Sequence, residues 1–222
     1  MTNRTELVLV RHGETDWNRA MRYQGQTDIP LNDLGRMQAR LGAERLAQES
    51  WDAIISSPLS RVMQTAEPIA AATGLSPIET DPDLMERHYG QAEGLLREER
   101  EARWPDQDWP GLEPMDHLQA RAMRALHTVA TRHAGQRVIV VSHGGLINSL
   151  LAGISDGRVG SGISHILNVS FTRIHSEDGK QWTIEVISDV DHLLDEQGIL
   201  NALTPERTTA QELAAAAVTT KE

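Results

Sequence analysis

Residues 7–15 read Leu7-Val8-Leu9-Val10-Arg11-His12-Gly13-Glu14-Thr15. The first four residues form an apolar run that is too short for a helix, and half of them are valine, which is typical of a buried strand in a parallel sheet. The run ends in an arginine, a histidine and a glycine. Open α/β sheets bind ligands outside the carboxyl ends of their strands, so Arg11 and His12 occupy the position of a functional site.

Two further short apolar runs, at 53–55 and 138–141, also read as strands, and helical patterns lie between the first two and after the second. One helix is expected over 34–47 with Asn32 as its N-cap, and another over 59–73 with Gly74 as its C-cap. Strands that alternate with helices form an α/β sheet with helices on both faces. We therefore expect a three-layer α/β/α sandwich around a mostly parallel central sheet.

The second half of the chain continues this alternation. A helix is expected over 113–134, before the third strand, and another over 144–152, directly after it. Two β-rich segments follow at 166–174 and 182–188, and a turn-like run of polar residues and glycine separates them. This arrangement predicts an edge hairpin or two neighbouring strands.

The length and composition of the chain suit one domain. Its 222 residues are 39% hydrophobic, which is enough to bury a full core, and we place this single domain at 1–203. Within it, the segment from about 81 to 114 lacks a regular period and is expected to be an irregular cover. The stretch 204–222 is rich in Ala, Thr and Glu, and is expected to be a helix-prone or flexible C-terminal tail.

Composition also excludes several classes of partner. The formal net charge of -11 argues against a nucleic-acid binder, because such proteins neutralise phosphates with a basic surface. No run approaches the roughly 18 apolar residues that would span a membrane, and the first residues lack the apolar core of a signal peptide. The chain has no cysteine, so neither a disulfide nor a thiolate metal site is available. We expect a cytoplasmic protein with no nucleic-acid or membrane partner.

Two of the predicted strands end in a histidine followed by glycine. Arg11-His12-Gly13 follows the first strand, and Ser142-His143-Gly144-Gly145 follows the third. A single His-Gly pair is usually a surface histidine, but two at equivalent strand ends indicate a site. Glycines such as Gly144 let backbone N–H groups approach an anion closely, so Gly144 is a substrate-binding candidate.

Arginines point to phosphate as that anion. The strand at 53–55 leads into a helix that carries Arg61 in its first turn, and the Arg61 side chain can reach the same edge of the sheet as Arg11. Arginine binds phosphate oxygens through a planar fork of N–H donors. Arg11 and Arg61 are therefore expected to form a clamp on a phosphoryl group.

The chain resembles the histidine phosphatase superfamily, also called the phosphoglycerate mutase-like family. The resemblance covers most of residues 6–195 in the order of the family. Its motifs are Leu9-Val10-Arg11-His12-Gly13-Glu14-Thr15-Asp16-Trp17-Asn18, Gln24-Gly25-Gln26-Thr27-Asp28-Ile29-Pro30-Leu31, Leu34-Gly35-Arg36-Met37-Gln38-Ala39, Ser56-Ser57-Pro58-Leu59-Ser60-Arg61-Val62-Met63-Gln64-Thr65-Ala66, Leu84-Met85-Glu86-Arg87-His88-Tyr89-Gly90 and Ser142-His143-Gly144-Gly145. It implies the phosphoglycerate mutase-like fold.

The resemblance also implies a catalytic set. His12 would be phosphorylated on a ring nitrogen, Glu86 would be the proton donor, and the phosphoryl group would be bound by Arg11, Arg61 and His143. A histidine attacks phosphorus only as the neutral ring, and two nearby arginine cations favour that form. The other ring nitrogen needs an acceptor that fixes the tautomer, for which a backbone carbonyl in the Gly13 loop is expected.

Further positions match the mouth of the family's pocket. Asn18 and Gln24 would line the phosphate pocket and Gly25 would contribute its backbone. Preorganised arginine donors stabilise the charge of phosphoryl transfer, so no metal and no cofactor are expected. The remaining histidines have no spacing that suggests a metal site. We expect a metal-independent phosphomonoesterase of histidine acid phosphatase type, acting on a small phosphorylated metabolite, and a homodimer remains open.

Two alternatives stay open. Mutases of this family carry a long insertion between the acid and the second histidine, whereas only residues 87–142 intervene here, which favours a phosphatase over a cofactor-dependent phosphoglycerate mutase. A non-catalytic phospho-ligand binding domain is the second alternative, because a fold alone does not give activity. Such relatives usually lose a core residue, and here all five are present. The sequence does not choose among sugar phosphates, phosphoglycerate-like acids and nucleotide-loop phosphates.

Overall fold

The computed structural model describes residues 4–194 and contains one six-stranded sheet with the strand order β3-β2-β4-β1-β5-β6. Strands β3, β2, β4 and β1 are parallel, whereas β5 lies antiparallel to β1, and β6 antiparallel to β5. The sheet is therefore mostly parallel, as predicted, and the predicted hairpin lies at its edge. The strands are β1 (Thr5–Arg11), β2 (Ala53–Ser56), β3 (Glu79–Thr80), β4 (Arg137–Ser142), β5 (Phe171–Ser176) and β6 (Thr183–Asp189).

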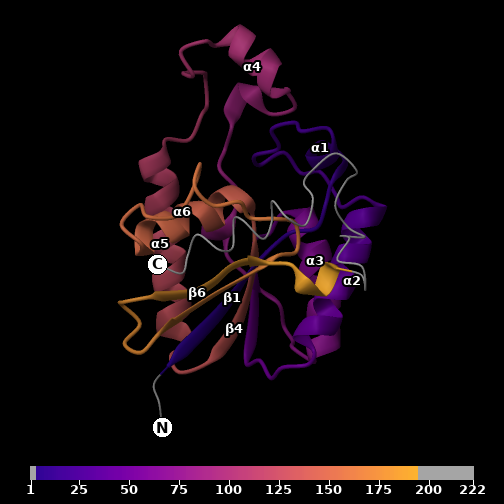
Figure 1. Cartoon of the computed structure of the whole chain (residues 1–222), viewed down its shortest axis with the longest axis vertical. Coiled ribbons are helices and arrows are strands. Elements are labelled where there is room, and N and C mark those ends of the chain that lie inside the picture. Colours follow the sequence, from indigo (N-terminus) through magenta and orange to yellow (C-terminus); the bar gives the residue numbers. More distant parts are fainter. Residues whose placement is uncertain (1–3, 195–222) are drawn as a thin grey trace.

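Helices cover both faces of the sheet. Figure 1 shows α2 and α3 on one side of the strands, α5 and α6 on the other, and α4 at the far end of the molecule from the N-terminus. This is the predicted α/β/α sandwich. The helices are α1 (Asp16–Arg19), α2 (Asp33–Leu46), α3 (Ser60–Thr73), α4 (Arg97–Arg103), α5 (Met115–Arg132) and α6 (Gly144–Ile154), with short 3-10 helices η1 (Pro82–Leu84), η2 (Gly90–Ala92) and η3 (Asp191–Leu193).

Strand β1 is buried on both of its faces. Leu7 and Leu9 belong to the core cluster that includes residues of α5 and α6, whereas Val8 and Val10 belong to the cluster that includes α2 and α3. The split follows from the two-residue period of a strand. Each such side chain contributes about 1.5–3 kcal/mol when fully buried, so the strand that ends at Arg11 is held firmly from two sides.

The predicted caps are confirmed. The Asn32 side chain accepts a hydrogen bond from the Gly35 N–H at the start of α2, and Gly74 ends α3 in the left-handed conformation with a φ of 73°. Residues with a side chain rarely adopt that φ, which is why a glycine closes the helix.

Two predictions of secondary structure are wrong in part. The segment 81–114 is not wholly irregular, because it contains η1, η2 and α4. The predicted strand at 166–174 begins only at Phe171. The residues before Phe171 contact the end of β1 and do not pair as a strand of the sheet. The Val169 N–H donates to the Arg11 carbonyl, and Val169 has a φ of 53°, which a strand does not allow. These tertiary contacts outweigh the β propensity of the segment.

The proposed extent of the single domain, 1–203, stays a prediction, and the predicted tail at 204–222 lies outside the described residues. Within residues 4–194, no helix has the length and apolar character needed to cross a membrane.

Candidate active site

The two histidines predicted from the sequence lie side by side. Strands β1 and β4 are parallel neighbours in which Arg11 is paired with Ser142, so His12 and His143 follow at the same level. The His12 N–H donates to the Ser142 carbonyl at 2.9 Å, and the two imidazole rings pack edge to face with centroids 5.2 Å apart. Both side chains are buried. The sheet topology therefore places both at one edge, as the sequence predicted.

The backbone sets the tautomer of His12. Nδ1 of His12 lies 2.7 Å from the Gly13 carbonyl oxygen, which can only accept a hydrogen bond. Nδ1 therefore carries the proton of the neutral ring and Nε2 keeps a lone pair. The Gly13 N–H is itself fixed by the Thr65 hydroxyl at 3.0 Å, and the Asn168 side chain donates to the His12 carbonyl at 2.8 Å. The loop behind the ring is thus anchored on both sides.

The surroundings of His12 favour its neutral form. Burial is the largest cause that lowers the pKa of His12 well below its ordinary value, and the cations Arg61 and Arg11 lower it further. The bond to the Gly13 carbonyl opposes this in part. An unprotonated Nε2 in this position is able to act as a nucleophile near neutral pH.

Arg61 is a second residue of the site that the backbone holds in place. It lies in the first turn of α3 and is fully buried. Its two terminal nitrogens donate to the carbonyls of Thr27 and Gly25 at 2.9 and 2.7 Å, and Nη2 also lies 3.2 Å from Nδ1 of His143. Gly25 has a φ of 55° and faces the side chain of Glu93 so closely that a Cβ would clash, so this loop requires glycine. The contacts hold the guanidinium in one orientation.

Arg11 is held by a separate set of contacts. Its Nη1 donates to the Ile166 carbonyl at 2.6 Å, and a Cβ on Gly144 would lie 3.4 Å from Arg11 Nε. Arg11 therefore packs against the start of α6 at ordinary contact distance. Burial lowers the pKa of Arg11 and of Arg61, while Glu86 acts in the opposite direction. Arginine remains protonated even so, and the site holds two fixed cations.

Three buried polar atoms at this site have no hydrogen-bond partner in the described part of the chain: Nε of Arg11, Nε of Arg61 and Oε1 of Gln24. An unsatisfied buried polar atom typically costs about 1–3 kcal/mol, so such atoms rarely gather without a reason. Two of the three are guanidinium N–H donors, which suit phosphoryl oxygens. Their convergence indicates an anion site.

His143 has the opposite tautomer from His12. Because Arg61 can only donate, Nδ1 of His143 accepts, and the proton lies on Nε2, which is 2.9 Å from the Ser57 hydroxyl. Burial lowers the pKa of His143 well below its ordinary value, with Arg61 as the next cause. The ring is thus a neutral group, wedged between Ser57, Arg61 and His12.

Glu86 lies at the N-terminus of α6. Its Oε2 accepts the Gly145 N–H at 3.0 Å, and its Oε1 accepts the N–H groups of Leu146 and Arg87 at 3.1 and 2.8 Å. A Cβ on Gly145 would clash with the carboxylate, so the second glycine of the His-Gly-Gly run admits Glu86. Oε1 has two donors and Oε2 only one, which leaves Oε2 with more capacity to carry a proton.

A small cavity of about 160 Å³ lies where these groups meet, and it is lined by Arg11, His12, Asn18, Arg22, Tyr23, Gln24, Gly25, Arg61, Glu86 and Tyr89. Seven of the nine predicted site residues line it. The other two, His143 and Gly144, lie behind it against Arg61 and Arg11. In the described part of the chain, no group of three or more histidine or acidic side chains is arranged to hold a metal ion.

Sequence reasoning missed several residues of this site. Arg22 and Tyr23 line the cavity but have no regular spacing from the motif residues, although both lie in the short run between Asn18 and Gln24. Asn168 is isolated in the sequence, and only the fold brings it to His12. Ser57 stands within the quoted motif before Arg61, so that motif was the signal that could have identified it.

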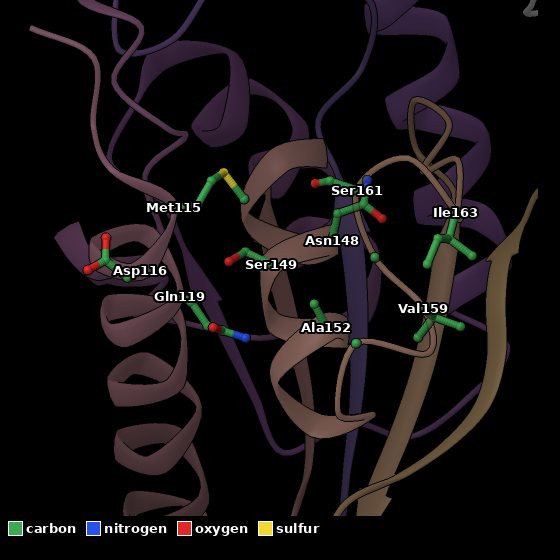
Figure 2. Close-up of a pocket in the computed structure, with 11 residues that line it drawn as sticks. Met115, Asp116, Gln119, Asn148, Ser149, Ala152, Val159, Ser161 and Ile163 are labelled. Carbon is green, nitrogen blue, oxygen red and sulfur yellow. The ribbon is translucent and has the colours of Figure 1, made fainter. Parts of the chain in front are cut away.

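A second, larger cavity of about 280 Å³ lies between α5, α6 and the loop at 157–163. Figure 2 shows its side chains, with Met115, Asp116 and Gln119 on α5 facing Asn148, Ser149 and Ala152 on α6. None of the predicted site residues lines it. The chemistry-bearing groups are therefore gathered in the smaller cavity.

Comparisons with known proteins identify the family of the chain. The family model of the histidine phosphatase superfamily (branch 1) matches residues 7–190. The uncharacterized phosphatase PhoE of Bacillus subtilis (strain 168) is 41% identical over 189 residues, which cover 85% of this chain and 97% of that protein. A metal-independent phosphoserine phosphatase of Arabidopsis thaliana is 41% identical over 202 residues, which cover 85% of this chain and 83% of that protein.

A solved structure gives the same relationship. The native mycobacterial glucosyl-3-phosphoglycerate phosphatase matches with a TM-score of 0.76 and 30% identity, covering 84% of this chain and all of that one, at 100%. The chain therefore belongs to the histidine phosphatase superfamily, among its phosphoglycerate mutase-like phosphatases.

Proposed function

We propose that this protein is a metal-independent phosphomonoesterase of histidine acid phosphatase type, which hydrolyses small phosphate monoesters through a phosphohistidine on Nε2 of His12. The observation that carries the proposal is the bond between His12 Nδ1 and the Gly13 carbonyl, because it leaves Nε2 as the one ring nitrogen with a lone pair. The unpartnered donors of Arg11 and Arg61 beside it supply the phosphate site.

In the first step, Nε2 attacks phosphorus while the bond to the ester oxygen breaks. The electron pair of that bond stays on the leaving oxygen, and Glu86 protonates it, so an alcohol departs. Negative charge is spread over three phosphoryl oxygens in the transition state, where guanidinium donors that are already oriented stabilise it without rearrangement. Arg61 meets this condition because two carbonyls fix it before substrate binds.

In the second step, water attacks the phosphorus of the phosphohistidine. Glu86, now a carboxylate, accepts a proton from that water, the P–N bond breaks, and its electron pair returns to Nε2. Inorganic phosphate leaves and Glu86 is protonated again for the next turnover. Three backbone N–H groups keep the carboxyl in place throughout both roles.

Besides the groups that act on the phosphoryl unit, Arg22, Tyr23 and Tyr89 line the cavity. Tyr23 and Tyr89 pack with ring centroids 5.0 Å apart, and Arg22 lies beside them with its Nη1 on the Gly94 carbonyl at 2.6 Å. Relatives named for phosphoserine and for glucosyl-3-phosphoglycerate support a phosphorylated metabolite as substrate. We propose that the alcohol part of the ester contacts these three side chains.

The test is a phosphate-release screen over phosphorylated metabolites, including O-phosphoserine and 3-phosphoglycerate, with no added metal and with excess chelator. Release from at least one ester at an unchanged rate in chelator is expected. Loss of activity in chelator that returns on adding a divalent metal would contradict the arginine clamp. His12→Ala is the matched control, because it removes the nucleophile and should give no release.

One arm of the same screen separates phosphatase from mutase. Incubation of 3-phosphoglycerate with 2,3-bisphosphoglycerate should give inorganic phosphate and no rapid formation of 2-phosphoglycerate. Water reaches the phosphohistidine of a phosphatase, whereas a mutase returns the phosphoryl group to a second phosphorylated ligand. Rapid interconversion of the two monophosphates would assign this protein to the mutases.

A further inference from the structure

Arg121 lies on α5 and has no contact with the cavity, yet it is buried and fully engaged. Its Nε and Nη2 donate to the two carboxylate oxygens of Glu113 at 2.7 and 2.8 Å. Its Nη1 donates to the carbonyls of Asp83, at 3.0 Å, and of Met85, and its Nη2 to that of Glu86 at 2.8 Å. A guanidinium has five N–H donors, and each one of Arg121 has an acceptor here.

These acceptors lie in the segment that carries Glu86. The carbonyls of residues 83, 85 and 86 bind Arg121, and the carbonyl between them, that of Leu84, accepts the Ser142 hydroxyl at 2.8 Å. No strand or α-helix satisfies these groups, so side chains from α5 and β4, and that of Gln26 on the Glu86 carbonyl, replace the usual backbone partners. The segment is therefore shaped by Arg121 more than by secondary structure of its own.

Glu113, the partner of Arg121, binds the two residues that follow Glu86. Its carboxylate accepts the His88 N–H at 3.0 Å, its carbonyl accepts Arg87 Nε at 2.8 Å, and its own N–H donates to the His88 carbonyl at 2.8 Å. Burial raises the pKa of Glu113, but Arg121 and the His88 N–H outweigh it and hold the pKa below its ordinary value. The pair thus grips the chain on both sides of Glu86.

We propose that Arg121, paired with Glu113, is a positioning residue that holds Glu86 in line with the leaving oxygen. The inference rests on the proposed function, in which Glu86 is the proton donor. The N-terminus of α6 fixes the carboxyl group of Glu86. Its backbone carbonyl is fixed by Arg121 at 2.8 Å, together with the Gln26 side chain at 3.0 Å. Proton transfer needs donor and acceptor within hydrogen-bond reach, so a small shift of this backbone lowers the rate of that step.

The dependence of kcat/KM on the leaving group distinguishes a positioning role from a purely structural one, because a structural defect would lower kcat/KM equally for all esters. O-Phosphoserine releases an alkoxide that must be protonated, whereas p-nitrophenyl phosphate releases a phenolate that is stable without a proton. The measured quantity is kcat/KM, which covers the first phosphoryl transfer. We compare Arg121→Lys, which keeps the charge but loses the fork, Glu113→Gln, which removes the charged partner, and Glu86→Gln as the reference.

Arg124→Lys is the matched control. Arg124 lies one turn further along α5 and binds the same segment, but only through the Asp83 carboxylate at 3.0 and 3.2 Å on an exposed surface. Arg124→Lys should leave kcat/KM unchanged on both substrates. Should Arg121→Lys fail to fold, Glu113→Gln carries the comparison, because it leaves the three carbonyl contacts of Arg121 in place.

For Arg121→Lys and Glu113→Gln, we expect kcat/KM on phosphoserine to fall at least about tenfold, within the range that general acid catalysis contributes, while p-nitrophenyl phosphate changes by less than about threefold. An equal fall on both esters, or no fall on either, would overturn the positioning role. If Glu86→Gln itself shows no dependence on the leaving group, the proposed donor is wrong, and that failure is separate from the failure of Arg121.

Discussion

His12 and His143 lie edge to face at 5.2 Å between ring centroids, yet their Nδ1 atoms have opposite roles. Nδ1 of His12 donates to the Gly13 carbonyl, whereas Nδ1 of His143 accepts from Arg61. In His12, the lone pair of the neutral ring therefore lies on Nε2. In His143, it lies on Nδ1 and already accepts a hydrogen bond from Arg61. Two histidines from equivalent strand ends thus differ in chemistry, and only His12 has a nitrogen left for attack.

This difference predicts where phosphate is trapped. Rapid quenching during turnover of a phosphate ester should give an acid-labile, base-stable phosphate on His12, identified by peptide mapping. His12→Ala should abolish both the label and turnover. His143→Asn should slow turnover but still label His12, because it removes a partner of Arg61 and leaves the nucleophile. A label on His143, or one that survives in His12→Ala, contradicts the assignment.

Arg61→Lys is predicted to lower kcat/KM strongly. A lysine keeps the positive charge, but it lacks the planar fork that bonds the Gly25 and Thr27 carbonyls and also carries the unpartnered Nε. Loss of one preorganised donor typically costs about 10²–10³ in rate, and we expect a fall of that size. Steady-state kinetics on one ester measures it, with the exposed Arg132→Lys of α5 as control. Near-normal turnover would refute the clamp.

The pH dependence of His12 is the next prediction. Burial, Arg61 and Arg11 lower its pKa well below 6.5, so the ring stays neutral as pH falls through the range where ordinary histidines become protonated. Titration of the ring protons by NMR should therefore show no charging of His12 near pH 6.5. Arg11→Gln removes one of the cations that lower this pKa, so the titration of His12 should move to higher pH in that variant.

A titration of His12 near pH 6.5 in the unaltered protein would contradict the electrostatic argument. An unchanged titration of His12 in Arg11→Gln would contradict it as well.

The sheet and its edge residues were predictable because their signals are local. Short apolar runs, the caps at Asn32 and Gly74, and the two His-Gly pairs each depend on a few neighbouring residues. The parallel arrangement then brings His12 and His143 together without any further information. Glu86 is predicted from its motif alone. The residues next to it do not distinguish a catalytic acid from a glutamate in a surface ion pair with Arg87.

The supporting contacts could not be predicted in the same way. Asn168 binds the His12 carbonyl across 156 positions of sequence, and Arg121 binds the Glu86 carbonyl across 35. The segment 166–170 has β propensity, but it serves as a loop around Arg11, because its backbone supplies the carbonyl of Ile166 and the N–H of Val169. Such roles follow from tertiary contacts, which have no period in the sequence.

His192 leads to a prediction about stability. It stacks on Phe171 with the ring planes 9° apart and centroids 4.1 Å apart, beneath α2. Burial is the main cause that lowers its pKa from 6.5 to about 4, and Asp189 opposes the shift. Between these two values the unfolded chain binds a proton that the folded protein does not, so the free energy of unfolding must fall as pH decreases.

The contribution of His192 is complete above pH 6.5, is lost progressively below it, and levels off near pH 4. Its size is at most about 3–4 kcal/mol, since one pKa unit corresponds to about 1.4 kcal/mol and the pKa falls from 6.5 to about 4. His192→Leu should therefore lose less stability than the unaltered protein between pH 7 and pH 5 in urea denaturation. His127→Gln, at an exposed site of α5, should follow the unaltered protein. Because His12 and His143 act in the same direction, a residual pH dependence is expected. Identical losses in all three proteins would show that the half-buried His192 ring contributes nothing.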